Sequence, residues 1–209
     1  MKSLLCLALF TLGSFTLRAQ QVKHIIIISV DGFRPDFYLD EKWPAPNLQY
    51  IYRNGTSAKG VTSVFPSVTY PSHTSIITGV PPAVHGVFYN TPFEPLGATG
   101  LWNSEYETIT AESLWDATKK AGLTTASVSW PVSIGAPVDY NIPEAFILEN
   151  PLDRRIPTSK YATPAGLFEE VQQKATGQME AIDLNINHLK IDENLGRIAA
   201  YLFKHIGHH

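Results

Sequence analysis

The sequence predicts an α/β fold in which a mostly parallel sheet is flanked by helices. Apolar stretches rich in β-branched residues alternate along the chain with stretches of helical spacing, an order typical of parallel sheets. The composition is that of a globular protein, because 44% of the 209 residues are hydrophobic and 17% are charged, with a formal net charge of -3. The sequence shows no basic stripe, so we expect no nucleic-acid polymer as a partner.

Residues 1–20 have the pattern of a secretory signal peptide. A positively charged start precedes an apolar stretch over residues 4–17, and Ala19 suits a cleavage site. The stretch is too short for a stable membrane span, although an uncleaved anchor is the alternative. Cys6 is the one cysteine and lies inside this stretch, so we expect the mature chain to form no disulfide. These features predict a secreted protein, periplasmic if it comes from a Gram-negative bacterium.

Residues 24–30 predict the first strand. They are apolar without alternation, which is typical of a strand buried on both faces in a parallel sheet. Asp31 follows directly, at the carboxyl end of this strand, where open α/β sheets gather their ligands. We expect a short helix over residues 46–53, started by Pro46, and a second strand over residues 58–64.

The stretch after the second strand predicts a helix that starts at Pro71 and stops at Gly79, because proline suits a first helical turn and glycine a helix end. Thr69 is then expected just before the helix N-terminus, where unpaired backbone N–H groups favour phosphate or sulfate. A hydroxyl there can be held as an alkoxide if a cation lies beside it. The alternative is that Thr69 is only a helix cap.

The second half of the chain predicts further elements and an unfinished sheet. We expect a helix over residues 111–120 closed by Gly122, a third strand over 123–130, helices over 164–174 and 194–205, and a loop with one short turn over 183–192. Three strands are fewer than a sheet usually holds, and no strand pattern follows the last helix. We therefore interpret residues 21–209 as the N-terminal part of a larger α/β domain, incomplete at its C-terminus.

Three residues suggest a reaction site: Asp31 after the first strand, Thr69 at the helix start, and Asn90 in the loop that follows this helix. A carboxylate and an alkoxide are hard oxygen ligands, which Zn²⁺ accepts alongside histidine. The cation would lower the pKa of the Thr69 hydroxyl. The Asn90 amide and the backbone amides of Thr69 and Tyr70 would bind the oxygen that gains charge. This arrangement predicts attack on a phosphate or sulfate ester through a covalent threonine intermediate.

The order and spacing of these pieces resemble the nucleotide pyrophosphatase/phosphodiesterase family of the alkaline phosphatase superfamily. The motifs are Val30-Asp31-Gly32-Phe33-Arg34-Pro35-Asp36, the stretch from Phe65 to His73, Thr78-Gly79, and His85-Gly86 with Asn90. The resemblance implies an alkaline-phosphatase-like sheet, Thr69 as nucleophile and zinc ligand, Asp31 as a ligand of the same zinc, and Asn90 as donor to a non-bridging phosphate oxygen. Trp130-Pro131-Val132-Ser133 resembles the family's Trp-Pro-Gly segment near the substrate pocket, with Val132 in place of glycine, which leaves substrate preference open.

The resemblance implies two Zn²⁺ ions per complete site, and this chain departs from that pattern. The family's site needs a further Asp and His set, yet neither Asp-x-x-x-His nor Asp-His follows residue 133. Two protein ligands fall short of the three or four that a zinc site needs, so we expect the remaining ligands to be missing from this chain. The weak candidates are Asp183, His188, His205, His208 and His209.

Several other residues have a structural interpretation beside the functional one. His73 lies one helical turn after Thr69 and either orients the nucleophile or makes a structural hydrogen bond, which we favour. His85-Gly86 is interpreted as a turn rather than a metal ligand. The aromatic residues are interpreted as packing rather than as a shelf for a nucleobase; they are Trp102, Tyr106 and Trp115.

Three functions remain open from the sequence. The first is a secreted, metal-dependent phosphodiesterase or nucleotide pyrophosphatase that acts on a small-molecule phosphate ester through phosphothreonine. The second is a hydrolase of phosphate monoesters, phosphonates or sulfate esters with the same nucleophile. The third is a catalytically incomplete chain with half of a metal site. The oligomeric state is not predicted.

Overall fold

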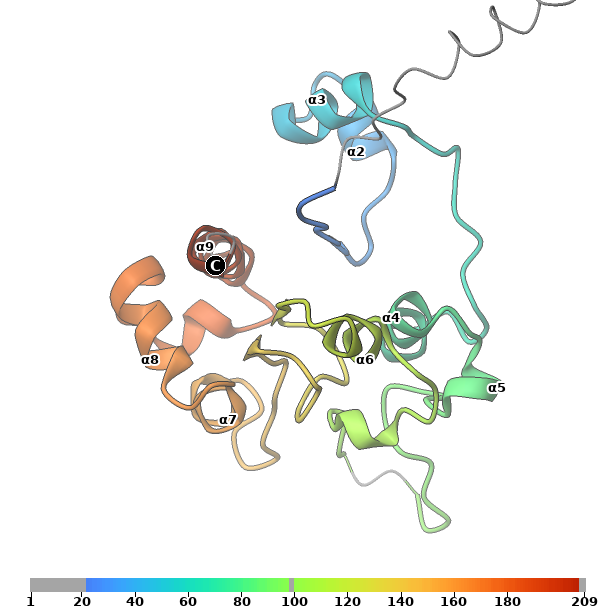
Figure 1. Cartoon of the computed structure of the whole chain (residues 1–209), viewed down its shortest axis with the longest axis vertical. Coiled ribbons are helices and arrows are strands. Elements are labelled where there is room, and N and C mark those ends of the chain that lie inside the picture. The colour runs from blue at the N-terminus through green and yellow to red at the C-terminus, as the bar shows by residue number, and fades with distance from the viewer. Residues whose placement is uncertain (1–21, 98–99, 207–209) are drawn as a thin grey trace, which may run out of the picture. The chain divides into compact units, whose positions relative to one another are not determined.

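The computed structural model describes residues 22–97 and 100–206 (Figure 1). The chain divides into two units, Met1–Gly32 and Phe33–His209. The predicted signal peptide over residues 1–20 lies outside the described residues, as do Cys6, His208 and His209. No helix in the described part of the chain is long and apolar enough to cross a membrane.

The described part of the first unit, residues 22–32, contains no helix or strand. The strand predicted over residues 24–30 is therefore wrong for this structure, and its apolar side chains are exposed, Ile25 to 83%. The physical reason is that a parallel strand needs hydrogen-bonded neighbours and covering helices, and residues 22–32 supply neither by themselves. Asp31 lies in a turn that ends at Gly32, whose φ is 63°.

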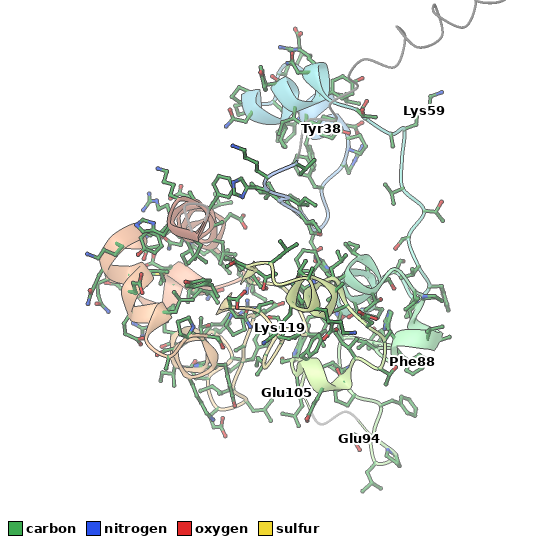
Figure 2. All side chains as sticks on the ribbon, viewed as in Figure 1. Tyr38, Lys59, Phe88, Glu94, Glu105 and Lys119 are labelled. Carbon is green, nitrogen blue, oxygen red and sulfur yellow. The ribbon has the colours of Figure 1, made fainter. Side chains whose placement is uncertain are left out.

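The second unit begins with two short helices that contact each other, α2 (Asp36–Leu39) and α3 (Pro46–Asn54). The predicted start of α3 at Pro46 is confirmed, since a missing N–H costs nothing at a first helical position. Residues 58–64 form no strand, so that prediction is wrong, and Val61 is 91% exposed. This connection, on which Lys59 lies (Figure 2), offers β-branched side chains without a sheet to pair with.

The helix that begins at the candidate nucleophile is α4 (Thr69–Thr78). It begins two residues before the predicted start, and Pro71 takes its third position, because the first-turn N–H groups have no helical acceptor and proline is tolerated there. Gly79 ends α4 with a φ of 70°, which confirms the predicted stop. α4 contacts α5 (Pro82–His85) and α6 (Leu114–Lys120) (Figure 1).

Helix α6 begins three residues later than predicted because Ser113 caps it. Ser113 Oγ accepts from the Asp116 N–H at 3.2 Å, and the Asp116 carboxylate accepts from the Ser113 N–H at 2.8 Å. The hydroxyl of Tyr106, in the 3-10 turn η1 (Tyr106–Thr108), also donates to Asp116. Gly122 follows the helix with a φ of 70°, as predicted.

The sheet of the second unit has two parallel strands, β1 (Ala126–Val128) and β2 (Tyr140–Ile142). β1 confirms the centre of the strand predicted over 123–130, whereas β2 was not predicted. Ser127 pairs with Asn141 in the register, and the Asn141 amide donates to the Ser133 carbonyl at 2.7 Å. A small parallel sheet with helices packed on it confirms the predicted α/β class.

The last third of the chain packs helices against this sheet (Figure 1). The helices predicted over 164–174 and 194–205 are confirmed with shifted ends, and the first of them continues into a π-helical turn. Their largest buried cluster includes Ile142, Phe168 and Ile198. The elements are α7 (Arg155–Tyr161), α8 (Leu167–Val171), η2 (Gln172–Thr176), η3 (Ala181–Leu184) and α9 (Lys190–Ile206).

Candidate functional site

Asn90 is held at the N-terminus of α4 by a hydrogen bond to the backbone. The Tyr70 N–H, which has no acceptor inside the helix, donates to Asn90 Oδ1 at 2.9 Å. An N–H can only donate, so the acceptor is the amide oxygen, and the Asn90 NH₂ group is turned to the other side as a donor. The expectation that the Tyr70 amide binds substrate is therefore wrong, because Asn90 already uses it.

Thr69 is the first residue of α4 and is half-buried. The N-cap is Val68, which makes no side-chain capping bond, so the interpretation of Thr69 as a helix cap is wrong. Its side chain therefore starts from the first helical turn, where the positive end of the helix dipole favours an anionic oxygen.

His73 supports the same helix start from one turn further along. Its Nδ1 lies 2.8 Å from the Thr69 carbonyl oxygen, which can only accept, so Nδ1 carries the proton. The buried ring meets the Trp130 ring edge-on at 5.1 Å. The structural hydrogen bond favoured from the sequence is confirmed, and it is made to the backbone of Thr69.

His85 is buried at the end of α5 and uses both ring nitrogens inside the protein. Its Nδ1 accepts from the Val87 N–H at 3.1 Å, so Nε2 carries the proton and donates to Ser75 Oγ at 2.9 Å. Burial lowers the pKa of the imidazole, so the neutral form is favoured. The predicted turn is confirmed, because Gly86 has a φ of 85° and an added Cβ would lie 3.3 Å from the Thr108 carbonyl oxygen.

We expect His85→Gln to reduce the loss of stability in acid. The folded pKa lies below the ordinary value of 6.5, so the folded state binds fewer protons than the unfolded state, and stability falls as the pH drops below 6.5. Glutamine does not titrate, so the variant should be less stable at about pH 7.5 but lose less between about pH 7.5 and 5. Urea unfolding at both values measures this, and an unchanged pH dependence would contradict it.

Val132 stands where the family pattern has glycine, and its backbone is left-handed, with a φ of 58°. A β-branched residue is strained in this region, by about 1–2 kcal/mol for the left-handed conformation. The side chain is fully buried and packs with Tyr70 and Val87. Val132 therefore combines a strained backbone with buried apolar contacts beside the start of α4.

Tyr70 is in contact with a stack of aromatic and charged side chains. The Tyr70 ring lies 5.2 Å from that of Trp102, which stacks on Phe146, and the Arg154 guanidinium covers Phe146 at 4.1 Å. Burial, with the nearby Glu144 carboxylate, raises the pKa of the Tyr70 phenol, so it stays neutral. The packing role predicted for the aromatic residues is confirmed for buried Trp115, whereas Trp102 stacks on Phe146 but is 40% exposed, so its role stays a prediction.

Asp31 belongs to the first unit, whereas Thr69 and Asn90 belong to the second. A shared metal for Asp31 and Thr69 stays a prediction. Within the described residues no three His, Cys, Asp or Glu side chains gather as a metal site, so these residues do not by themselves fit a zinc centre.

The weak ligand candidates in the described residues have structural roles. The Asp183 carboxylate accepts from the Glu180 N–H at 2.8 Å and forms an ion pair with Lys190 at 3.1 Å. The hydrogen bond from Glu180 is the main cause that lowers the pKa of Asp183. His188 Nδ1 accepts from the Lys190 N–H, and His205 Nδ1 donates to the Tyr201 carbonyl. Each of these three side chains therefore has a hydrogen-bonding role within the protein that needs no metal.

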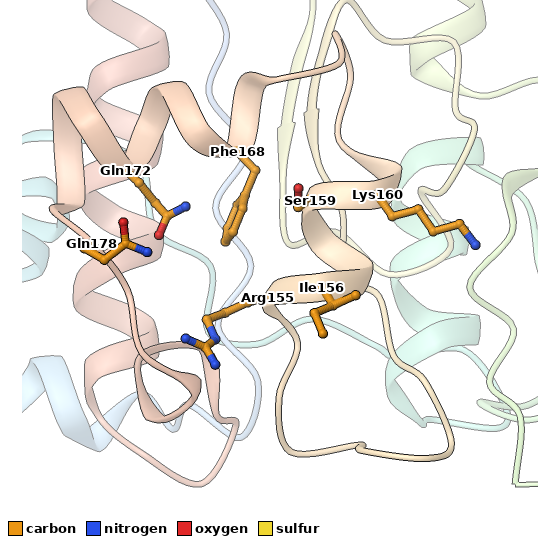
Figure 3. Close-up of a pocket in the computed structure, with 7 residues that line it drawn as sticks. All are labelled: Arg155, Ile156, Ser159, Lys160, Phe168, Gln172 and Gln178. Carbon is orange, nitrogen blue, oxygen red and sulfur yellow. The ribbon is translucent and has the colours of Figure 1, made fainter.

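An open pocket of about 390 Å³ lies between α7 and the segment from α8 to residue 178 (Figure 3). It contains neither Thr69 nor Asn90. Arg155 is bound by the Asp153 carboxylate at 2.9 and 2.7 Å, and Ser159 donates to Glu169. Because these lining groups already have partners, we do not assign the reaction to this pocket.

The second unit has an α/β fold, and the N-terminus of its helix α4 presents the Thr69 hydroxyl and the Asn90 amide donor. The family described as type I phosphodiesterase / nucleotide pyrophosphatase matches residues 25–202, and the chain belongs to this family. This confirms the resemblance stated from the sequence.

The chain is also similar to individual proteins and to a solved structure. Human ectonucleotide pyrophosphatase/phosphodiesterase family member 5 is 32% identical over 136 residues, 62% of this chain and 28% of that protein. A bis(5'-adenosyl)-triphosphatase of Xenopus laevis is 29% identical over 117 residues, 52% of this chain and 24% of that protein. Murine ectonucleotide pyrophosphatase/phosphodiesterase 5, solved as an inactive variant with AMP, has 23% identity and a TM-score of 0.48 over 84% of this chain and 51% of that one.

Proposed function

We propose that the chain carries the nucleophile and one oxyanion donor of a phosphodiesterase or nucleotide pyrophosphatase. The observation that carries this proposal is the hydrogen bond from Tyr70 to Asn90, which fixes a side-chain amide beside Thr69 at the start of α4. Family membership supports the reaction class, and the names of the relatives support nucleotides as the substrate class. Because the chain spans only 28% of the human relative, the activity of the whole protein is part of the proposal.

The proposed reaction begins at the Thr69 hydroxyl. Oγ attacks phosphorus, a bond from Oγ to phosphorus forms, and the bond to the leaving oxygen breaks, so that the proton lost from the Thr69 hydroxyl ends on the leaving group. The Asn90 NH₂ group donates to a non-bridging oxygen as that oxygen gains charge, and the positive end of α4 favours the same charge. Water then attacks phosphorus, its hydroxyl stays on the released phosphate, and its other proton goes to Thr69 Oγ as the bond from Oγ to phosphorus breaks.

Zinc is part of the proposal in a limited sense. The resemblance implies that Asp31 and Thr69 would share one Zn²⁺, which supplies a Lewis acid that lowers the pKa of the hydroxyl. Asp31 and Thr69 belong to different units, and the proposed reaction is derived from Thr69 and Asn90 alone. We also propose that the protein is exported, which the signal-peptide pattern and the relatives named ectonucleotide enzymes support.

The catalytically incomplete chain is the second candidate, because neither Asp-x-x-x-His nor Asp-His follows residue 133 in the sequence. We expect the 209-residue protein with added zinc to show little or no hydrolysis of bis-p-nitrophenyl phosphate. A chain that spans the full length of the relatives should be active under the same conditions. Release of p-nitrophenol measures both. Robust turnover by the 209-residue protein would show that its site is complete, and an inactive long chain would contradict the proposed function.

A further inference from the structure

The buried His85 connects two parts of the structure that must stay in register for the candidate site. One is α4, which begins at Thr69 and carries Ser75, and the other is the loop from Gly86 to Asn90 that follows α5. Phe88, in the middle of this loop, is exposed (Figure 2). Val87, in contrast, is buried and packs with Tyr70 and Val132, so apolar contacts also help to hold this loop at the start of α4.

Both connections are direct hydrogen bonds. The Nε2–H of His85 donates to Ser75 Oγ on α4 at 2.9 Å, and Nδ1 accepts from the Val87 N–H, the third residue before Asn90, at 3.1 Å. His85 itself is fully buried, so water cannot replace either bond. The outer side of the same loop is held by Asn103, whose amide donates to the Tyr89 carbonyl at 2.7 Å.

We propose that His85 is a positioning residue that holds the loop against α4, so that Asn90 Oδ1 stays on the Tyr70 N–H and its NH₂ group stays directed at the substrate oxygen. His85 does not act as a base, because its Nδ1 already accepts from the backbone and its Nε2 carries the proton. The inference rests on the proposed function, since only there does the orientation of Asn90 matter for the reaction.

Amide hydrogen exchange of the 209-residue protein tests this without any turnover. The Tyr70 N–H reports whether Asn90 stays in place, and Asn90→Ala sets the exchange rate of the open state. We expect Ser75→Ala, which removes the hydroxyl partner of Nε2 but leaves the backbone bond between His85 and Pro71 of α4, to speed Tyr70 exchange by up to roughly fivefold, the effect of one lost hydrogen bond. His85→Asn should keep an acceptor for the Val87 N–H but lose the hydrogen bond to Ser75 Oγ. We expect this variant to speed Tyr70 exchange as well.

Thr78→Ala is the matched control, because Thr78 also lies on α4 and donates one hydroxyl bond, to the Thr74 carbonyl at 2.8 Å, but has no connection to the loop. Its Tyr70 exchange should equal that of the wild type. If Ser75→Ala and His85→Asn also match the wild type, His85 only stabilises its own turn and the proposal is overturned. The expected exchange pattern together with an inactive chain that spans the full length of the relatives would instead contradict the proposed function alone.

Discussion

Thr69→Ala lowers kcat for bis-p-nitrophenyl phosphate on the order of 10⁴-fold or more, in a chain that spans the full length of the relatives. The change removes the oxygen that forms the bond to phosphorus, and no neighbouring group can replace a covalent nucleophile. Thr69 is the first residue of α4, so alanine is tolerated in the helix and the fold should be kept. Steady-state kinetics measure the loss, and a thermal melt verifies folding.

Two controls separate the nucleophile from the helix that carries it. Thr78→Ala removes a hydroxyl from the other end of α4 and should keep kcat within about twofold, since it lies far along the helix from the reaction. Rapid acid quenching followed by peptide mass spectrometry should find phosphate on Thr69 in the wild type and none in the variant. Near-normal turnover of Thr69→Ala would remove Thr69 from the mechanism.

Local signals in the sequence were sufficient for the helices that have clear ends. Pro46 at the start of α3 and Gly79 at the end of α4 act through their own backbone geometry, so these two boundaries follow from the local sequence, whereas the start predicted at Pro71 was two residues late. α7 was missed because Pro157 interrupts its sequence. It occupies the third helical position there, as Pro71 does in α4, where proline still costs no hydrogen bond.

Strand prediction failed for a different reason, because a strand depends on partners that are distant in sequence. Residues 24–30 and 58–64 have the composition of strands, yet neither range pairs in this structure. Tyr140–Ile142 pairs with Ala126–Val128 although its three residues include a buried asparagine. The Asn141 amide nitrogen donates to the Ser133 carbonyl, a contact that the sequence does not reveal, whereas its buried Oδ1 has no partner among the described residues.

The candidate site was predictable as residue types and not as contacts. The sequence indicated an amide donor at Asn90 and a hydroxyl at Thr69, but the bond from Tyr70 that orients Asn90 spans 20 residues. The double use of His85 likewise requires α4 and α5 to pack together. Tertiary packing therefore decides which backbone amide remains for a substrate, and the sequence assigned Tyr70 wrongly.

Arg154→Ala is expected to destabilise the fold by about 3–5 kcal/mol, the usual cost of removing one partner of a buried ion pair. Only 6% of the Arg154 side chain and 15% of Glu144 are exposed, and they lie 3.3 Å apart. Without the guanidinium, the Glu144 carboxylate stays buried near the Tyr70 phenol, whose pKa it already raises in addition to burial. The contact of Arg154 with the Phe146 ring is lost as well. The free energy of urea unfolding at neutral pH measures the change.

Arg197→Ala is the matched control for this prediction, because Arg197 also pairs with a glutamate, Glu193, at 3.9 Å, but with both side chains more than half exposed. Such a surface pair contributes about 0–1 kcal/mol, so the control should unfold close to the wild-type urea concentration. Replacing Arg154 by Met and Glu144 by Leu together should recover much of the loss, since no buried charge then remains unpaired. Equal unfolding midpoints for Arg154→Ala and Arg197→Ala would show that the Arg154 pair does not stabilise the packing behind Tyr70.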